Sequence, residues 1–163
     1  MMKVEFRDTL IIDGQRIEGD LKSVVLPFSH LSVRAIIIRK EDGAILGALH
    51  RPGGMYALPG GAIDDGESAE QAIIRELEEE NITLINSDQE WRERLAVDYF
   101  SGYNELCLWY LFLVNGVEIN DSEELIDVRW IPQDENPWYP QNREKILIHL
   151  QRHLPDYVTT MKG

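Results

Sequence analysis

A glycine pair followed by an acidic amphipathic segment is the feature that most constrains how this chain folds. The stretch GGAIDDGESAEQAIIRELEEEN, residues 60–81, begins as a tight turn and continues as a helix over about residues 69–80. Ser68 is a favoured N-cap, Gln71 completes a capping-box pattern, and Asn81 can adopt the left-handed conformation that ends helices. The apolar residues of this helix predict that it packs against a sheet.

The acidic residues of the expected helix do not all face solvent. At about 100° per residue, Glu76 and Glu80 fall inside the apolar stripe and Glu79 falls at its edge. A carboxylate that faces a sheet is costly, and like charges at i,i+4 repel each other. Arg75 lies near Glu79, but one guanidinium does not neutralise this set of carboxylates, whereas a divalent cation does. Ligands that offer only oxygen suit Mg²⁺, with Mn²⁺ as a substitute.

Small residues surround the acidic face of the helix. Ala69 and Ala72 let the helix approach the sheet closely, and Gly60 and Gly61 bring backbone groups near a ligand or metal. The sequence therefore predicts a pocket between the glycine turn, the helix and the sheet. Arg51 precedes a Pro-Gly-Gly loop beside this region and is a candidate for contact with a substrate phosphate.

The rest of the chain predicts a mixed sheet and a second principal helix, over Gln141–His153. Strands are expected over residues 32–39, 44–50, 95–101, 105–114 and 125–131. Thr9–Ile12 and Gln15–Glu18 flank Asp13-Gly14 as a hairpin, whereas Asn115–Glu124 is expected to be a polar loop. The expected fold class is α+β, an α/β/α sandwich with a mixed β-sheet between helices.

The composition and net charge indicate which cellular compartment and which kinds of partner to expect. No apolar run reaches the roughly 18 residues of a membrane span, the first residues do not form a signal peptide, and a single Cys107 fits a reducing compartment. We therefore expect a cytoplasmic protein with no membrane partner. The formal net charge of −13 argues against nucleic-acid binding through a basic face. A small anionic substrate remains compatible with this charge when a divalent cation reverses the local sign.

The glycine turn and the acidic helix together resemble the Nudix box, G-x5-E-x7-R-E-U-x-E-E-x-G-U, in which U is a bulky aliphatic residue. The matching positions are Gly61, Glu67, Arg75, Glu76, Leu77, Glu79 and Glu80. The departure is at the end, where Ile82 stands in place of the usual Gly and Thr83 in place of an aliphatic residue. The resemblance implies a Nudix domain over residues 32–163, with residues 1–31 as an N-terminal strand or hairpin extension packed on it.

The resemblance implies a hydrolase that cleaves a diphosphate linkage in a nucleoside diphosphate-linked small molecule or a nucleoside triphosphate. The implied metal ligands are Glu76, Glu79 and Glu80, helped by Glu67 and a backbone carbonyl near Gly60 or Gly61. Glu79 is the expected general base, because it lies at the edge of the stripe nearest to solvent. The resemblance also allows a glutamate of a later loop, Glu123 or Glu124, as the alternative base, and Arg75 is expected to orient Glu79 or Glu76.

Two other functions are open at this point. A catalytically silent Nudix-fold sensor that binds a nucleotide is the main alternative, and the altered end of the box is what motivates it. The intact carboxylates argue against a sensor, because a binder has no need of acids that repel one another. An RNA-cap hydrolase is disfavoured by the acidic charge of the chain.

Several residues outside the box have two interpretations. Trp138 and Tyr139 either stack on a nucleobase or pack the second helix against the sheet. His149 and His153 have the i,i+4 spacing of zinc ligands, but no third ligand is evident, so we expect them at the surface. The N-terminal segment either covers the site or builds a homodimer.

Overall fold

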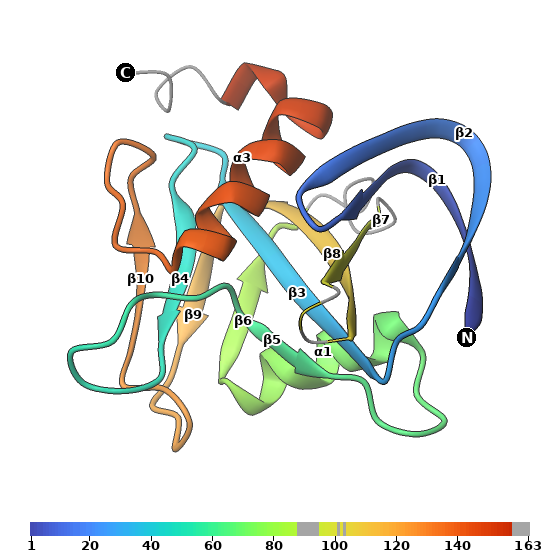
Figure 1. Cartoon of the computed structure of the whole chain (residues 1–163). Helices are drawn as coiled ribbons and strands as arrows, with labels where there is room; N and C mark the ends of the chain where they lie inside the picture. Colours follow the sequence, from blue (N-terminus) through green and yellow to red (C-terminus); the bar gives the residue numbers. More distant parts are fainter. Residues whose placement is uncertain (88–94, 101, 103, 158–163) are drawn as a thin grey trace.

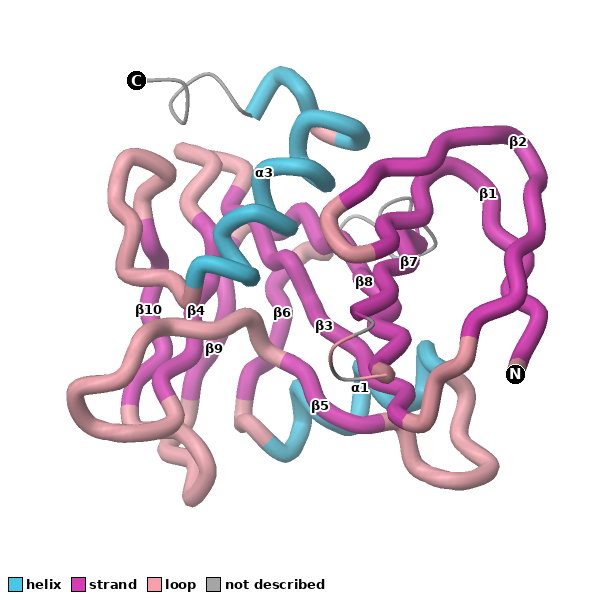
Figure 2. The backbone as a smooth tube through the Cα atoms, in the orientation of Figure 1, coloured by secondary structure: helices cyan, strands magenta, loops and turns pink. Residues whose placement is uncertain are grey.

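The computed structural model describes residues 1–87, 95–100, 102 and 104–157. A mixed sheet runs through the molecule, with helix α1 (Ala69–Glu79) against one face and helix α3 (Pro140–His153) against the other (Figures 1 and 2). This arrangement confirms the α+β sandwich expected from the sequence. Among the described residues, no helix has both the length and the apolar character needed to span a bilayer.

The large sheet has the strand order β10-β4-β3-β8-β7-β1-β2, and β5 pairs separately with β3. Its strands are β1 (Met2–Ile12), β2 (Gln15–Leu26), β3 (His30–Arg39), β4 (Ile45–Leu49), β5 (Gly60–Ala62), β7 (Leu95–Phe100), β8 (Glu105–Val114) and β10 (Asp127–Ile131). A smaller sheet pairs β6 (Ile82–Ile85) with β9 (Gly116–Ile119), and a 3-10 turn, η1 (Pro155–Tyr157), follows α3.

Strands β3 and β8 form the centre of the large sheet. They run parallel, from His30 beside Glu105 to Arg39 beside Val114. Most residues of β8 and the residues 35–38 of β3 are buried, which explains their nearly continuous apolar sequences. Because side chains alternate along a strand, Ile36 packs toward α3 and Ile37 toward α1. The central strands thus divide the apolar residues into one core on each face.

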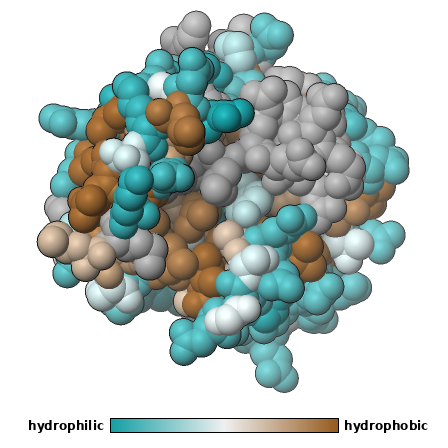
Figure 3. Space-filling model, turned by 90° about the vertical axis from the view of Figure 1, so that its right-hand side faces the viewer, coloured by the Kyte–Doolittle hydropathy of each residue, from teal (hydrophilic) through white to brown (hydrophobic). Residues whose placement is uncertain are grey.

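The N-terminal hairpin extends the large sheet. Its turn is at Asp13 and Gly14, which have φ values of 48° and 82°. This confirms the predicted hairpin, although both strands are longer than expected. Strand β1 pairs in parallel with β7, and Leu21 and Val25 of β2 are exposed. Figure 3 views the molecule from the side of the hairpin and shows patches of apolar surface among polar ones. The division of the chain at residue 31 stays a prediction.

Two expectations about the C-terminal half were wrong. Gly116–Ile119 is a strand within the segment expected to be a polar loop, and it pairs antiparallel with β6 at Ile82. Such short strands carry little periodicity, so only the pairing reveals them. His149 and His153 are also not at the surface, because α3 turns both rings toward the sheet, where they are 0% and 7% exposed.

Candidate functional site

The glycine pair lies on β5, directly against β3. Gly60 pairs with Arg34 and has φ of +145°, and a Cβ atom there would overlap the carbonyl oxygen of Val33. A Cβ atom on Gly61 would overlap the carboxylate of Glu76. Glycine at both positions therefore lets β5 lie between the central strand and the acidic helix.

Helix α1 begins and ends as its sequence predicts. Ser68 accepts a hydrogen bond from the backbone N–H of Gln71, and the Gln71 side chain accepts one from the backbone N–H of Ser68. Asn81, just beyond the helix, has φ of 56°. The rotational setting of the helix relative to the sheet follows from Ala72, Ile73 and Leu77, which are buried in the core with residues of β3.

That setting buries two of the acidic side chains. Glu76 and Glu80 are 8% and 1% exposed, whereas Glu78 and Glu79 are exposed. Glu79 lies at the margin of the buried face, and its side chain reaches Arg75 on the preceding turn. The structure thus separates the carboxylates as the helical spacing predicts.

Arg75 connects four groups around the helix and the glycine strand. Its Nε donates to Glu67 Oε1 at 2.8 Å, and its Nη2 donates to the backbone oxygen of Ala62 at 2.9 Å. Its Nη1 donates to Glu76 Oε1 at 2.9 Å and to Glu79 Oε2 at 3.2 Å. The hydrogen bond from Arg75 is the main reason that the pKa of Glu67 is lowered. Arg75 therefore orients carboxylates from both ends of the motif.

Glu80 lacks a comparable partner. Its Oε2 atom is buried and accepts no hydrogen bond from the described residues. The pKa of Glu80 is raised to about 8, mainly by burial and also by the negative charges of Glu76 and Glu124. The backbone of Gly60 and the guanidinium of Arg34 act in the opposite direction. A buried carboxyl group in such a position is stabilised by a cation or remains protonated.

The donor atoms around Glu80 fit a hard divalent cation. They are the carboxylate oxygens of Glu80 and Glu76, and Glu80 Oε2 accepts no hydrogen bond from the described residues. In this conformation, however, no group of metal-ligating side chains converges on one point among the described residues. Arg75 instead bonds to Glu76 and Glu79, so these two side chains must turn from it to bind an ion.

Comparison with known proteins decides the family. A model of the NUDIX domain matches residues 29–150, which is more than half of the chain. The chain belongs to the Nudix family. This confirms the resemblance found in the sequence and the enzyme class that it implied, a Nudix hydrolase.

Individual relatives agree with this assignment. The chain is 32% identical over 124 residues to an RNA pyrophosphohydrolase from Shewanella denitrificans, covering 64% of this chain and 70% of that protein. It is 37% identical over 89 residues to an 8-oxo-dGTP diphosphatase from Haemophilus influenzae, covering 52% of this chain and 62% of that protein.

Solved structures share the fold. A bifunctional NMN adenylyltransferase/ADP ribose pyrophosphatase from Francisella tularensis, complexed with AMP and a Mn ion, superposes with a TM-score of 0.61 at 28% identity. The match covers 78% of this chain but only 43% of that longer protein. A MutT NUDIX hydrolase from Burkholderia pseudomallei gives a TM-score of 0.52 at 24% identity, covering 76% of this chain and 97% of the other.

The remaining predicted site residues of this Nudix hydrolase lie in loops. Glu124 is exposed, and its charge acts on Glu80. Arg51 is exposed, and its Nη2 donates to the hydroxyl group of Tyr139 at 3.3 Å. A contact between Arg51 and a substrate phosphate stays a prediction. Trp138 is only 3% exposed and packs in the core beneath α3, which favours the packing interpretation for this residue.

Sequence reasoning missed Arg34. This residue lies in the buried strand β3, pairs with Gly60 and lowers the pKa of Glu80 through its charge. It also lines a surface groove of about 500 Å³ that extends from β3 to Ala62 and Glu105. The available signal was one cation inside the apolar run LSVRAIII, because an Arg in a buried strand requires a partner.

Proposed function

We propose that this Nudix hydrolase cleaves a diphosphate linkage in a nucleoside diphosphate-linked small molecule or a nucleoside triphosphate, with Mg²⁺ as its metal and Mn²⁺ as a substitute. The observation that carries the proposal is the burial of Glu76 and Glu80 beside the glycine strand, with one Glu80 oxygen unsatisfied. It is supported by relatives named an RNA pyrophosphohydrolase and an 8-oxo-dGTP diphosphatase, and by the related Francisella enzyme complexed with AMP and a Mn ion.

The residues proposed to hold the ion are Glu76, Glu79 and Glu80, together with Glu67 and the backbone carbonyl of Gly61. When bound, a divalent cation supplies positive charge for the diphosphate oxygens and lowers the pKa of a coordinated water. Without it, the buried carboxylates would repel the substrate that they are meant to receive.

The protein's own residues then position the substrate and move the proton. Glu79 is the proposed general base, because its side chain is 47% exposed and can reach a water at the margin of the site. Arg75 is proposed as a positioning residue, because its Nη1 holds Glu79 and Glu76 in this conformation, before they turn toward an ion. Glu124 remains the alternative base, since its loop brings its charge within electrostatic range of Glu80.

The activity is tested with a panel of candidate substrates. The purified chain is incubated with Mg²⁺ or Mn²⁺ and with nucleoside triphosphates, oxidised nucleoside triphosphates, ADP-ribose, dinucleoside polyphosphates, NADH and nucleotide sugars. We expect turnover of at least one member and none after chelation of the metal. A folded protein that hydrolyses no member of the panel contradicts the proposal.

The helix supplies a matched pair of variants for the role of Glu79. Glu79→Gln should lower kcat by about 100-fold or more, as expected when a general base is lost. Glu78→Gln removes the same charge from the neighbouring exposed residue and should leave kcat unchanged. Equal rates for the two variants would remove Glu79 from the mechanism, and Glu124→Gln would then be tested as the base.

The sensor alternative loses its motivation in the structure. Asn81 ends the helix with φ of 56°, and Ile82 is 4% exposed and starts β6. The altered end of the box is thus accommodated beyond the carboxylates. Calorimetry that shows nucleotide binding together with an absence of product would still favour a sensor.

We also propose that the enzyme is cytoplasmic and that its substrate is a small-molecule nucleotide, with no nucleic-acid partner. The net charge of −13 supports this, because it disfavours contact with a polyphosphate backbone. A homodimer built through the N-terminal hairpin belongs to the same proposal, and light scattering of the full chain and of a variant with Leu21 and Val25 changed to Ser would test it.

A further inference from the structure

The end of the Nudix box in this chain departs from the family pattern at Ile82, which stands where the family usually has Gly. Ile82 begins β6 directly after the helix, is 4% exposed and pairs with Ile119 of β9. Strand β9 therefore ends beside the end of α1. The next residue of the chain, Asn120, lies against Asn81 and donates its backbone N–H to the Asn81 oxygen.

Asn81 connects the end of the helix to the loop of residues 120–126. Its backbone oxygen accepts the hydrogen bond from the N–H of Asn120 at 3.1 Å. Its side-chain Nδ2 donates to the backbone oxygen of Asp121 at 2.6 Å. Asn81 and Asp121 are 40 residues apart in the sequence, so this side-chain contact joins two separate segments of the fold.

The left-handed conformation at the helix end does not by itself require an asparagine. Asn81 has φ of 56°, and glycine is the residue that most often takes this conformation after a helix. A glycine would end the helix equally well, but it would offer no donor to Asp121. The amide side chain of Asn81 is therefore explained by its contact with the loop rather than by the turn.

The same loop is also held at its other end. The backbone N–H of Ile126 donates to the backbone oxygen of Leu49 at 2.8 Å. Between the two ends, the hydroxyl group of Ser122 accepts a hydrogen bond from the backbone N–H of Glu124 at 3.1 Å. Glu124 is thus carried by a loop with an anchor on each side, and Asn81 is the anchor on its N-terminal side.

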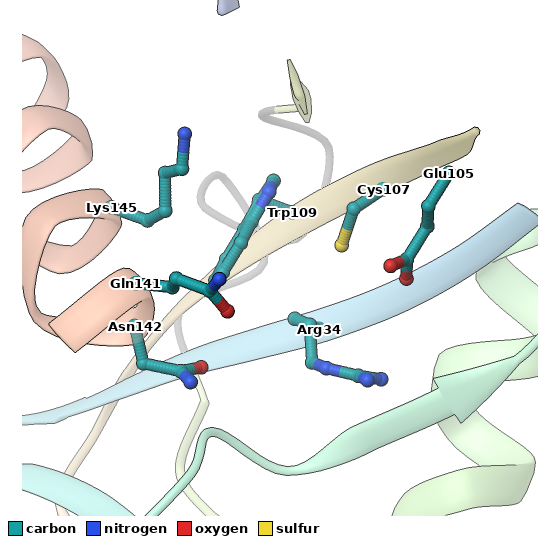
Figure 4. A pocket seen from close by; sticks show the side chains of 7 residues that line it. All are labelled: Arg34, Glu105, Cys107, Trp109, Gln141, Asn142 and Lys145. Atoms are coloured by element: carbon teal, nitrogen blue, oxygen red, sulfur yellow. The ribbon is translucent and has the colours of Figure 1, made fainter. Parts of the chain in front are cut away.

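Charged groups from two elements outside α1 act on Glu80. Arg34 extends from the central strand β3, where it also lines a small pocket with Asn142 and Lys145 of α3 (Figure 4). Burial is the main cause of the raised pKa of Glu80, the charge of Arg34 lowers this pKa, and the charge of Glu124 raises it further. The sheet fixes the position of Arg34, whereas the position of Glu124 depends on its loop.

We propose that Asn81 is a positioning residue of this Nudix hydrolase, which holds Glu124 at the acidic site through the loop of residues 120–126. Glu124 then adds negative charge near Glu80 and favours the divalent cation that the site is proposed to bind. The inference rests on the proposed function for that cation, whereas the anchoring of the loop does not. The altered end of the box thus joins the acidic helix to a loop that supplies one more carboxylate.

The anchor is tested first on the metal-free protein, by hydrogen exchange of the backbone amides of residues 120–126. Asn81→Gly keeps the left-handed turn and removes only the side-chain donor, so the thermal midpoint should not change. We expect exchange in the loop to become about fivefold faster, the size expected when one hydrogen bond is lost. Asn86→Gly makes the same change at another exposed asparagine, with φ of 51°, and should leave the loop unchanged. Equal exchange in the two variants would overturn the inference.

The effect on the cation is measured by calorimetry with Mn²⁺ alone, without a nucleotide. Glu124→Gln should weaken Mn²⁺ binding about tenfold, because one negative charge is removed from a partly solvated site. Asn81→Gly should weaken it about fivefold, since the charge is kept but its loop is released. The double variant should bind Mn²⁺ no more weakly than Glu124→Gln, because Asn81 acts through Glu124. Additive losses would show a general structural effect and overturn the inference.

Turnover separates this inference from the proposed function. With a nucleotide that the original chain hydrolyses, Asn81→Gly should raise the Mg²⁺ concentration for half-maximal rate about fivefold, and Asn86→Gly should not. Loop exchange and Mn²⁺ binding that respond as expected, in a chain that hydrolyses no nucleotide, would contradict the proposed function and leave the anchor intact. Turnover in a chain whose loop exchange and Mn²⁺ binding do not respond to Asn81→Gly would contradict the anchor alone.

Discussion

The two faces of the large sheet bury ionisable groups of opposite sign. On the α1 face, Glu76 and Glu80 are buried beside the glycine strand, and the pKa of Glu80 is raised. On the α3 face, Lys145 and His149 are buried, and the pKa of His149 is lowered. In each case burial disfavours the charged form. On the α1 face a bound cation would stabilise the charged form of Glu80, whereas on the α3 face burial keeps His149 neutral.

The two faces also differ in how far the sequence reveals their charged residues. The acids of the α1 face lie within one helix and follow one spacing, whereas the cations of the α3 face come from β3 and α3. The positions of the acids thus follow from spacing within one segment, whereas the cations of the α3 face come together only in the folded chain.

Replacement of Gly60 should have the largest effect, because the α1 face depends on a close backbone approach. Gly60→Ala would place a Cβ atom on the backbone of β3 at a φ of +145°, with an expected stability loss of about 4 kcal/mol or more. Gly61→Ala meets only the end of the Glu76 side chain and should cost about 1 kcal/mol while impairing turnover. Urea denaturation and kinetics distinguish the two, and equal stabilities would contradict the close approach at Gly60.

Replacement of Ile82 should have the next largest effect. Ile82→Gly restores the residue usual in the family, but it removes a buried side chain that packs with α1 on this face. We expect a loss of about 3 kcal/mol in the free energy of unfolding. Thermal denaturation measures the loss, with Thr83→Val at the neighbouring exposed position as the control. A more stable Ile82→Gly variant would show that the family residue suits this turn better.

The contribution of Glu80 to the stability of the metal-free protein should fall as pH rises. The pKa of Glu80 is about 8 in the folded protein and about 4.5 when unfolded, so the folded state holds its proton over this range. The contribution of Glu80 to stability is therefore fully present below pH 4.5 and falls toward pH 8 by at most about 1.4 kcal/mol per pH unit. Glu80→Gln should flatten this slope. Mg²⁺ should restore stability at pH 8 in the original chain only.

His149 should make the protein less stable as pH falls, which is the opposite of the effect of Glu80. Its pKa is about 3 when folded and 6.5 when unfolded, so stability is fully present above pH 6.5 and is lost as pH falls. Between pH 6.5 and 5, above the range in which ordinary carboxylates titrate, we expect the free energy of unfolding to fall by about 1–2 kcal/mol. His149→Phe should remove it, as measured by chemical denaturation. An unchanged slope in that variant would show that other groups cause the acid dependence.

Much of the fold was predictable because it depends on local rules. The hairpin turn at Asp13-Gly14, the caps of α1 and the apolar runs of β3 and β8 follow from residue type and spacing. Strand β9 was not predictable, because four residues carry little periodicity and gain their conformation from pairing with β6.

The sequence by itself determined the acidic helix, the burial of Glu76 and Glu80, and the family to which the chain belongs. Helical geometry relates residue spacing to direction, so one segment contains this information. Only the tertiary structure decided that Arg34 lies between two cavities and that Lys145 and His149 are buried. Their surroundings are formed by β3, β8 and α3 together, and the spacing within any one of these elements does not record which neighbours the others provide.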